Sequence, residues 1–128
     1  MATALLFSGG CAAEGTGPAA GRSESFNPIY IGAEAEALDA ELVRITAEML
    51  GARGPADVLD YAGCALAGYA DARGHGFARH LRTTVEETGG VWRADAVYTI
   101  SPVIPAGART IDVEAQMSAC EETGIPQL

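Results

Sequence analysis

Residues 91–101, VWRADAVYTIS, alternate between apolar and polar side chains, and this alternation decides the fold class that we expect. A period of two residues is typical of a strand with one dry face and one wetter face. Residues 109–117, RTIDVEAQM, have the same period. The intervening residues 102–108, PVIPAGA, have the prolines and glycine of a turn, so we predict an antiparallel hairpin. The apolar side chains of its strands are Trp92, Ala94, Ala96, Tyr98 and Ile100, then Ile111, Val113, Ala115 and Met117.

Three stretches before this hairpin have apolar residues at the helical spacing of three and four. They are residues 33–49, 55–72 and 77–88. Acidic residues crowd the start of the first stretch, where a helix dipole favours negative charge. We therefore predict three helices. The apolar positions are Ala35, Leu38, Leu42, Ile45 and Met49 in the first, and Phe77, Leu81 and Val85 in the third.

The second predicted helix, PADVLDYAGCALAGYADA, has small residues four apart. Gly63 is followed by Ala67, and Cys64 is followed by Gly68. Glycine costs up to about 1 kcal/mol relative to alanine inside a helix. Small residues at this interval let another element approach closely.

The chain begins with a short apolar run, ATALLF, that is typical of a buried strand. Residues 8–23 are rich in glycine and predict a loop, and a second strand follows from Ile29, just after Pro28. We therefore expect one α+β domain over residues 1–128, with a tail at 118–128. Its mainly antiparallel sheet would consist of two N-terminal strands plus the C-terminal hairpin, covered on one face by about three helices. Such a small sheet leaves an edge or a face open, so we also expect a homo-oligomer.

The charge balance bears on partners. The formal net charge is −9, and the sequence contains no lysine. Binding to a phosphate backbone depends on clustered cations that displace counterions, so we expect no nucleic-acid partner. No stretch approaches the length of a membrane span, so we expect no membrane partner either.

The cysteines suggest a compartment. Cys11, Cys64 and Cys120 are far apart and odd in number, and no pair has the spacing of metal ligands. Nothing here resembles a disulfide framework, so we expect a reducing cytoplasm. Residues 5–11, LLFSGGC, have the character of a lipoprotein cleavage site, but no basic segment precedes them and the apolar run is short.

Ser8, Gly9 and Gly10 end the first predicted strand and are candidate ligand-binding residues, because bare backbone N–H groups can surround phosphate oxygens. This SGG resembles the start of the PP-loop ATP pyrophosphatase signature, which continues with any residue, then Asp-Ser. Here Ala12 and Ala13 occupy those two positions, so the chain departs from the signature and we do not assign that family.

Three residues are candidates for catalysis: Cys11, His75 and His80. Cys11 could be a nucleophile if a neighbouring cation or helix end lowered the pKa of its thiol. The imidazole side chain of histidine is a common general acid or base. The two histidines are five residues apart, which is not the spacing of two metal ligands on one helical face, so we predict no metal and no cofactor.

Arg79 and Tyr98 complete the candidate ligand-binding residues. Arg79 belongs to a local group of cations with Arg73 and Arg82, and arginine forks suit carboxylates and phosphates. Tyr98 offers a hydroxyl group. The terminal hairpin could also bring carboxylates together on its wetter faces. Its polar residues there are Asp95, Thr99, Asp112 and Glu114.

Three functions fit these residues, and they do not decide whether the chain is an enzyme. The leading hypothesis is a small-molecule-binding α+β protein, either a plain binding protein or a cofactor-independent isomerase, lyase or hydrolase. The first alternative is a non-catalytic assembly or accessory subunit. The second alternative is a thiol-dependent enzyme that uses Cys11.

Overall fold

The computed structural model describes residues 26–107 and 109–128. Strand and helix alternate unevenly along this part of the chain. The elements are β1 (Ile29–Asp39), β2 (Leu42–Leu50), α2 (Pro55–Ala72), β3 (Phe77–Thr88), β4 (Val91–Ser101), β5 (Thr110–Asp112) and α3 (Val113–Thr123).

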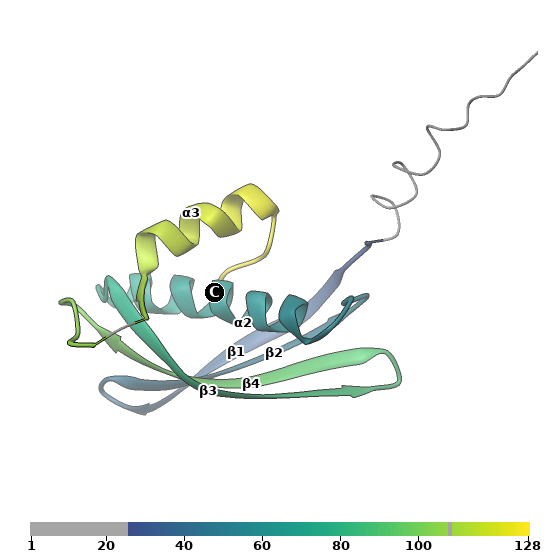
Figure 1. The fold of residues 1–128 in the computed structure, drawn as a ribbon, viewed down its shortest axis with the longest axis horizontal. Helices are drawn as coiled ribbons and strands as arrows, with labels where there is room; N and C mark the ends of the chain where they lie inside the picture. Colours follow the sequence, from purple (N-terminus) through teal and green to yellow (C-terminus); the bar gives the residue numbers. More distant parts are fainter. Residues whose placement is uncertain (1–25, 108) are drawn as a thin grey trace, which may run out of the picture.

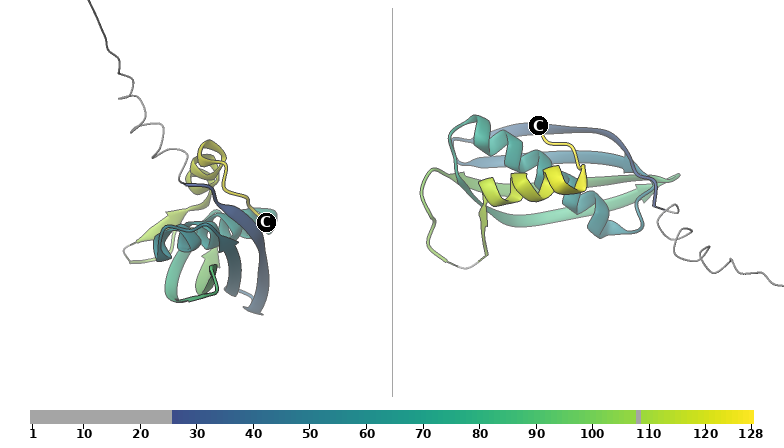
Figure 2. Two further views of the ribbon diagram at one scale, coloured as in Figure 1. Left: turned by 90° about the vertical axis from the view of Figure 1, so that its right-hand side faces the viewer. Right: turned by 90° about the horizontal axis from the view of Figure 1, so that it is seen from above.

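The strands form one antiparallel sheet in the order β1-β2-β4-β3-β5. The sheet curls as a half-barrel, and α2 crosses its concave face (Figure 1). Helix α3 packs on α2 from the side opposite the sheet, so the layers are sheet, α2 and α3 (Figure 2). The other face of the sheet has no helix over it among the described residues.

The core lies between α2 and the sheet. Every residue of α2 from Tyr61 to Ala70 is buried, because the sheet lies on one side of the helix and α3 on the other. The sheet contributes alternate residues of β2 and β4, as the period of two requires. The core residues of these strands are Val43, Ile45, Ala47 and Met49, and Ala94, Ala96, Tyr98 and Ile100.

The predicted fold class is therefore wrong in its elements. We expected about three helices over a four-stranded sheet, whereas the described residues contain five strands and two helices. Residues 33–49 are not a helix but the β1–β2 hairpin. A spacing of four satisfies both the helical period and the strand period, so Ile45 and Met49 fit either structure. The β-branched residues of β2 favour the strand.

The predicted helix 77–88 is also wrong, because these residues form β3. A Gly89–Gly90 turn joins β3 to β4, and both glycines have positive φ, 59° and 87°. Positive φ at both positions is the requirement of a type I′ hairpin turn, so Gly-Gly was a hairpin signal rather than a helix stop. The spacing of Phe77, Leu81 and Val85 misleads because a bulge at Leu81 shifts the register.

The predicted terminal hairpin is wrong as well. Residues 91–101 form a strand as predicted, but β4 pairs with β2 and β3. Only Thr110–Asp112 of the second predicted strand is extended, and this short strand pairs with β3. Asp112 ends it, because its side chain accepts a hydrogen bond from the backbone N–H of Ala115 at 3.1 Å and so caps α3.

Two other expectations hold. Residues 55–72 form a helix, and the strand after Pro28 begins at Ile29. Residues 118–123, which we assigned to a tail, form the second half of α3. The predicted strand at 2–7 and loop at 8–23 lie outside the described residues.

The small residues of α2 admit close neighbours, as predicted. A Cβ atom at Gly68 would overlap the backbone carbonyl oxygen of Leu128 and lie 2.8 Å from its nitrogen. Cys64, on the same helix, forms a disulfide bond with Cys120 of α3, with 5.9 Å between their Cα atoms. The expectation of reduced thiols is therefore wrong for this pair. Sequence spacing could not reveal it, because the two cysteines are 56 residues apart.

Candidate functional site

The sheet face that α2 leaves uncovered carries most of the charged side chains of the strands. Strand register arranges them in three adjacent rows that run across β1, β2, β4 and β3. The rows are Glu36, Arg44, Val97 and Arg82; Glu34, Thr46, Asp95 and Thr84; and Gly32, Glu48, Arg93 and Glu86. We call this surface the open face.

Ion pairs link neighbouring strands across the open face. Arg44 lies between Glu36 and Asp95, at N–O distances of 3.1 and 3.4 Å. Arg93 pairs with Glu48 at 3.2 Å. Pairs this exposed contribute little to stability, about 0–1 kcal/mol each. Their main effect is to arrange charge on the surface.

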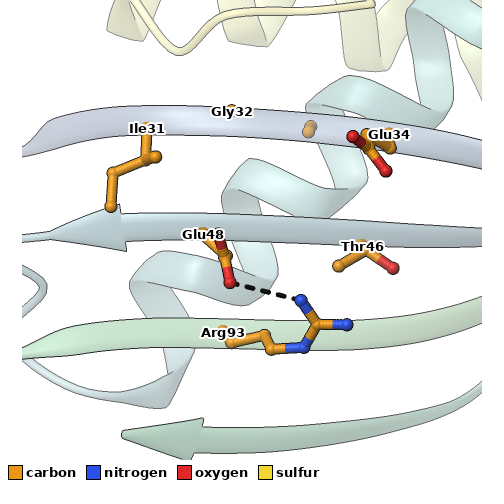
Figure 3. A pocket seen from close by; sticks show the side chains of 7 residues that line it. Ile31, Gly32, Glu34, Thr46, Glu48 and Arg93 are labelled. Atoms are coloured by element: carbon orange, nitrogen blue, oxygen red, sulfur yellow. Dashed lines mark hydrogen bonds and ion pairs between the residues drawn. The ribbon is translucent and has the colours of Figure 1, made fainter. Parts of the chain in front are cut away.

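A shallow hollow of about 280 Å³ lies on the open face beside β1. Figure 3 shows Glu48 and Arg93 joined across it, with Glu34 and Thr46 beside them. Glu34 has no ion-pair partner among the described residues. A second hollow, of about 160 Å³, lies on the other side of Arg93. The first is lined by Ile31, Gly32, Ala33, Glu34, Thr46, Glu48 and Arg93, and the second by Arg82, Thr84, Glu86, Arg93 and Asp95.

An apolar row borders the charged rows at one end of the open face. Ile29, Leu50 and Val91 are aligned there by the register of β1, β2 and β4. Ile31 lies next to this row, at a bulge in β1, and lines the first hollow. Ile29 is 54% exposed and Ile31 is 49% exposed. Large aliphatic side chains grouped on a surface in this way are typical of binding surfaces.

The sequence-predicted site residues are only partly brought together. Ser8, Gly9, Gly10 and Cys11 lie outside the described residues. His75 is half-buried in the turn between α2 and β3. These candidates therefore stay predictions.

Tyr98 and His80 do meet, at the end of the sheet away from the apolar row. Their ring centroids are 5.1 Å apart, and His80 also contacts the hydroxyl group of Thr83. Tyr98 is only 2% exposed, and this burial raises its pKa to about 12. At neutral pH the Tyr98 hydroxyl is therefore a neutral phenol inside the core.

The three grouped arginines point to different places. The Arg73 guanidinium stacks on the Tyr69 ring at 3.7 Å. Arg79 donates a hydrogen bond to the backbone carbonyl of Ala106. Arg82 lies on the open face. The predicted cluster does not form, because Arg73 lies at the end of α2 and the Arg79 guanidinium is bonded to the β4–β5 loop.

The predicted convergence of carboxylates does not occur either. Asp95 lies on the open face, Asp112 caps α3, and Glu114 belongs to α3. Residues 26–107 and 109–128 contain no group of three or more His, Cys, Asp or Glu side chains that could hold a metal ion.

A second charged cluster, at the start of α2, escaped sequence reasoning. Arg53 donates hydrogen bonds to both carboxylate oxygens of Asp57, at 2.9 and 3.0 Å, and these bonds hold the pKa of Asp57 below its ordinary value. Burial and the charge of Asp57 raise the pKa of nearby Asp60. Arg53 also stacks on Phe26 at 3.6 Å. The four-residue spacing of Arg53 and Asp57 was the available signal.

Helix length bears on the membrane question. Neither helix in the described part of the chain has the length and apolar character needed to cross a membrane.

Comparison with known proteins identifies the family but no activity. The family model described as the YNQ4 C-terminal domain matches residues 30–124. An uncharacterized 26.9 kDa protein from Paracoccus denitrificans, named for the region 5′ of nqo8, is 35% identical over 85 residues. That match covers 66% of this chain and 33% of the relative, so the chain spans about a third of the relative's length. No solved structure matches. Since the family model covers both helices and nearly all of every strand, the chain belongs to the YNQ4 C-terminal domain family.

Proposed function

We propose that this chain is a non-catalytic accessory domain that binds a protein partner on the open face of its sheet. The observation that carries the proposal is the exposed apolar group of Ile29 and Ile31 beside the charged rows. A protein partner buries such aliphatic side chains, and the surrounding charges select the partner.

The shape of the open face favours this function over small-molecule binding. Its two hollows measure about 280 and 160 Å³. Pockets that enclose drug-sized ligands usually measure about 300–1,000 Å³ and bury most of the ligand. A small-molecule site, and a thiol-dependent activity of Cys11, stay predictions because residues 8–11 lie outside the described part of the chain.

The disulfide supports a proposal about the location. The expectation of a cytoplasmic protein rested on the apparent lack of a disulfide framework, and the Cys64–Cys120 bond removes that support. Disulfides persist mainly in oxidising compartments. We therefore propose that the domain works in such a compartment. Mass spectrometry after thiol alkylation of protein isolated from cells, with and without reductant, would detect the bond.

The partner can be sought among gene neighbours. The relative from Paracoccus denitrificans is named for its position in the 5′ region of nqo8. The corresponding first candidates for this chain are the products of the genes adjacent to its own, purified and tested one at a time by biolayer interferometry.

A pair of matched variants tests the surface. Ile29→Ser with Ile31→Ser should weaken the binding by at least about tenfold, since two large aliphatic side chains leave the interface. Val103→Ser with Ile104→Ser is the control, because these residues are 66% and 69% exposed on the β4–β5 loop. Equal effects of the two variants, or no binding by any neighbouring product, would contradict the proposal.

A further inference from the structure

We infer that the outer edge of β1 accepts an extended basic segment of the partner as an additional strand. This inference rests on the proposed function, because it names the chemistry of the partner beside the open face. The sheet ends at β1, which pairs with β2 on one side and with no other strand of the described residues. An edge strand presents backbone N–H and C=O groups that can pair with another chain.

β1 is the longer of the two edges. It has eleven residues, whereas β5, at the opposite edge, has three and leads directly into α3. The middle of β1 is also regular, because Gly32 to Ala37 pair with β2 without a register shift. Register shifts at Ile31 and Leu38 frame this segment, and both side chains are exposed, at 49% and 40%.

Two common devices that block edge pairing, lysine and proline, are absent from this segment. Lysine, proline and inward-pointing charges protect many edge strands. Residues 32–37, GAEAEA, contain neither lysine nor proline. Their two charges lie on the open face, where Glu36 pairs with Arg44 and Glu34 has no ion-pair partner in the described parts of the chain.

The side chains on the two faces of β1 determine which residues an added strand needs. On the open face, Glu34 and Glu36 would lie beside alternate residues of an added strand. On the α2 side, Ala33 and Ala35 pack against the core. An added strand therefore fits when basic residues face the two glutamates and small or apolar residues alternate with them. Such a strand would extend the sheet further around α2.

Charge argues against a second copy of this chain as the occupant. Antiparallel pairing of two β1 strands centred on Ala35 would place Glu34 of each copy opposite Glu36 of the other. Like charges directly opposite each other destabilise a strand pair. The net charge of −9 adds general repulsion between copies.

Synthetic peptides test the edge. The probe is the capped peptide Arg-Ala-Arg-Val-Arg-Ala, and two peptides of the same charge serve as controls. One has the arginines in a single block, and the other is N-methylated at every backbone nitrogen, so that neither of its edges can donate to β1. We expect the probe to bind at least about tenfold more tightly than either control by isothermal titration calorimetry, because only the probe combines alternation with backbone hydrogen bonds. Equal binding of the N-methylated peptide would overturn the inference.

Variants of the chain test the charge. Glu34→Gln with Glu36→Gln should weaken binding of the probe about fivefold through the loss of two cross-strand charge pairs. Glu121→Gln with Glu122→Gln, two exposed residues of α3, is the matched control for net charge and should leave binding unchanged. Equal effects of the two double variants would also overturn the inference.

Competition separates this inference from the proposed function. If a purified partner binds in an Ile29- and Ile31-dependent way and the probe does not displace it, the edge inference fails and the proposed function stands. If the probe binds with the expected dependence on backbone and charge but no neighbouring protein binds, the proposed function fails and the edge site stands.

Discussion

Tyr98 shows how one side chain links the sequence pattern to the core. Its place in the alternation of residues 91–101 puts it among the apolar side chains, and the structure buries it there. The sequence also predicts its hydroxyl group as a ligand-binding group. Burial makes the neutral phenol the favoured form, which is why its pKa rises to about 12.

This burial predicts a dependence of stability on alkaline pH. The folded-state pKa of about 12 lies above the ordinary value of 10.0, so the contribution of Tyr98 is complete below pH 10 and is lost as the pH rises to about 12. Tyr98→Phe should therefore reduce the fall in the free energy of unfolding over this range. Urea titrations at several pH values, together with the ultraviolet absorbance of tyrosinate, provide the measurement. Ionisation of all four tyrosines near pH 10 in a chain that is still folded by circular dichroism would contradict this account.

Helix α2 shows what an element requires of its residues. The helix lies between the sheet and α3, so it needs apolar side chains on the side that faces the sheet and small side chains on the side that faces α3. The glycines there cost helix stability but let the C-terminal residues approach. The sequence shows this requirement as small residues spaced four apart, but it does not show which segment packs against them.

Gly68→Ala tests this close packing. The new methyl group would overlap the backbone of Leu128, and overpacking of this kind costs about 1–3 kcal/mol, which exceeds the gain in helix propensity of up to about 1 kcal/mol. We expect a net loss of stability in urea denaturation.

Gly63→Ala is the matched control in the same helix. Its Cβ would lie 3.0 Å from Nε2 of Gln116, at the end of a flexible side chain that can move. We expect the free energy of unfolding to stay unchanged or to rise by up to about 1 kcal/mol. If both variants lose the same stability, close packing at Gly68 is not the cause.

At the scale of the whole molecule, the Cys64–Cys120 bond joins the outer layer to the helix that the sheet encloses. It closes a loop that contains β3, β4 and β5, because the two cysteines are 56 residues apart. Val113 and Cys120 are the buried residues of α3. The attachment of α3 therefore depends strongly on the covalent bond.

Loss of this bond should destabilise the whole domain. The chain-entropy relation gives about 4 kcal/mol for a loop of this length. The double variant Cys64→Ala with Cys120→Ala should unfold at lower urea concentration than the oxidised chain and should not respond to reductant. Cys11 is retained in both proteins, so a response to reductant in the unsubstituted chain belongs to the Cys64–Cys120 pair. Identical urea midpoints with and without reductant in the unsubstituted chain would contradict the prediction.

Local sequence patterns predicted the secondary structure correctly where the apolar residues fit only one period, helical or strand. The alternation of residues 91–101 predicted β4, and the stripe of residues 55–72 predicted α2. Local patterns failed for residues 33–49 and 77–88. A spacing of four residues fits both the helical period and the strand period, and bulges in β1 and β3 hide the strand period. The open face was missed for the same reason, since its rows exist only when β1 and β3 are strands.

The sequence by itself determined the elements whose apolar residues follow one period, either helical or strand, from end to end. It also determined where small residues allow another segment to pack closely. Tertiary structure decided the rest: the strand order, the rows of charge on the open face, the cap at Asp112 and the pairing of Cys64 with Cys120. Each of these depends on which distant segments lie side by side. Burial against α2 selects that arrangement, and no local spacing along the chain encodes it.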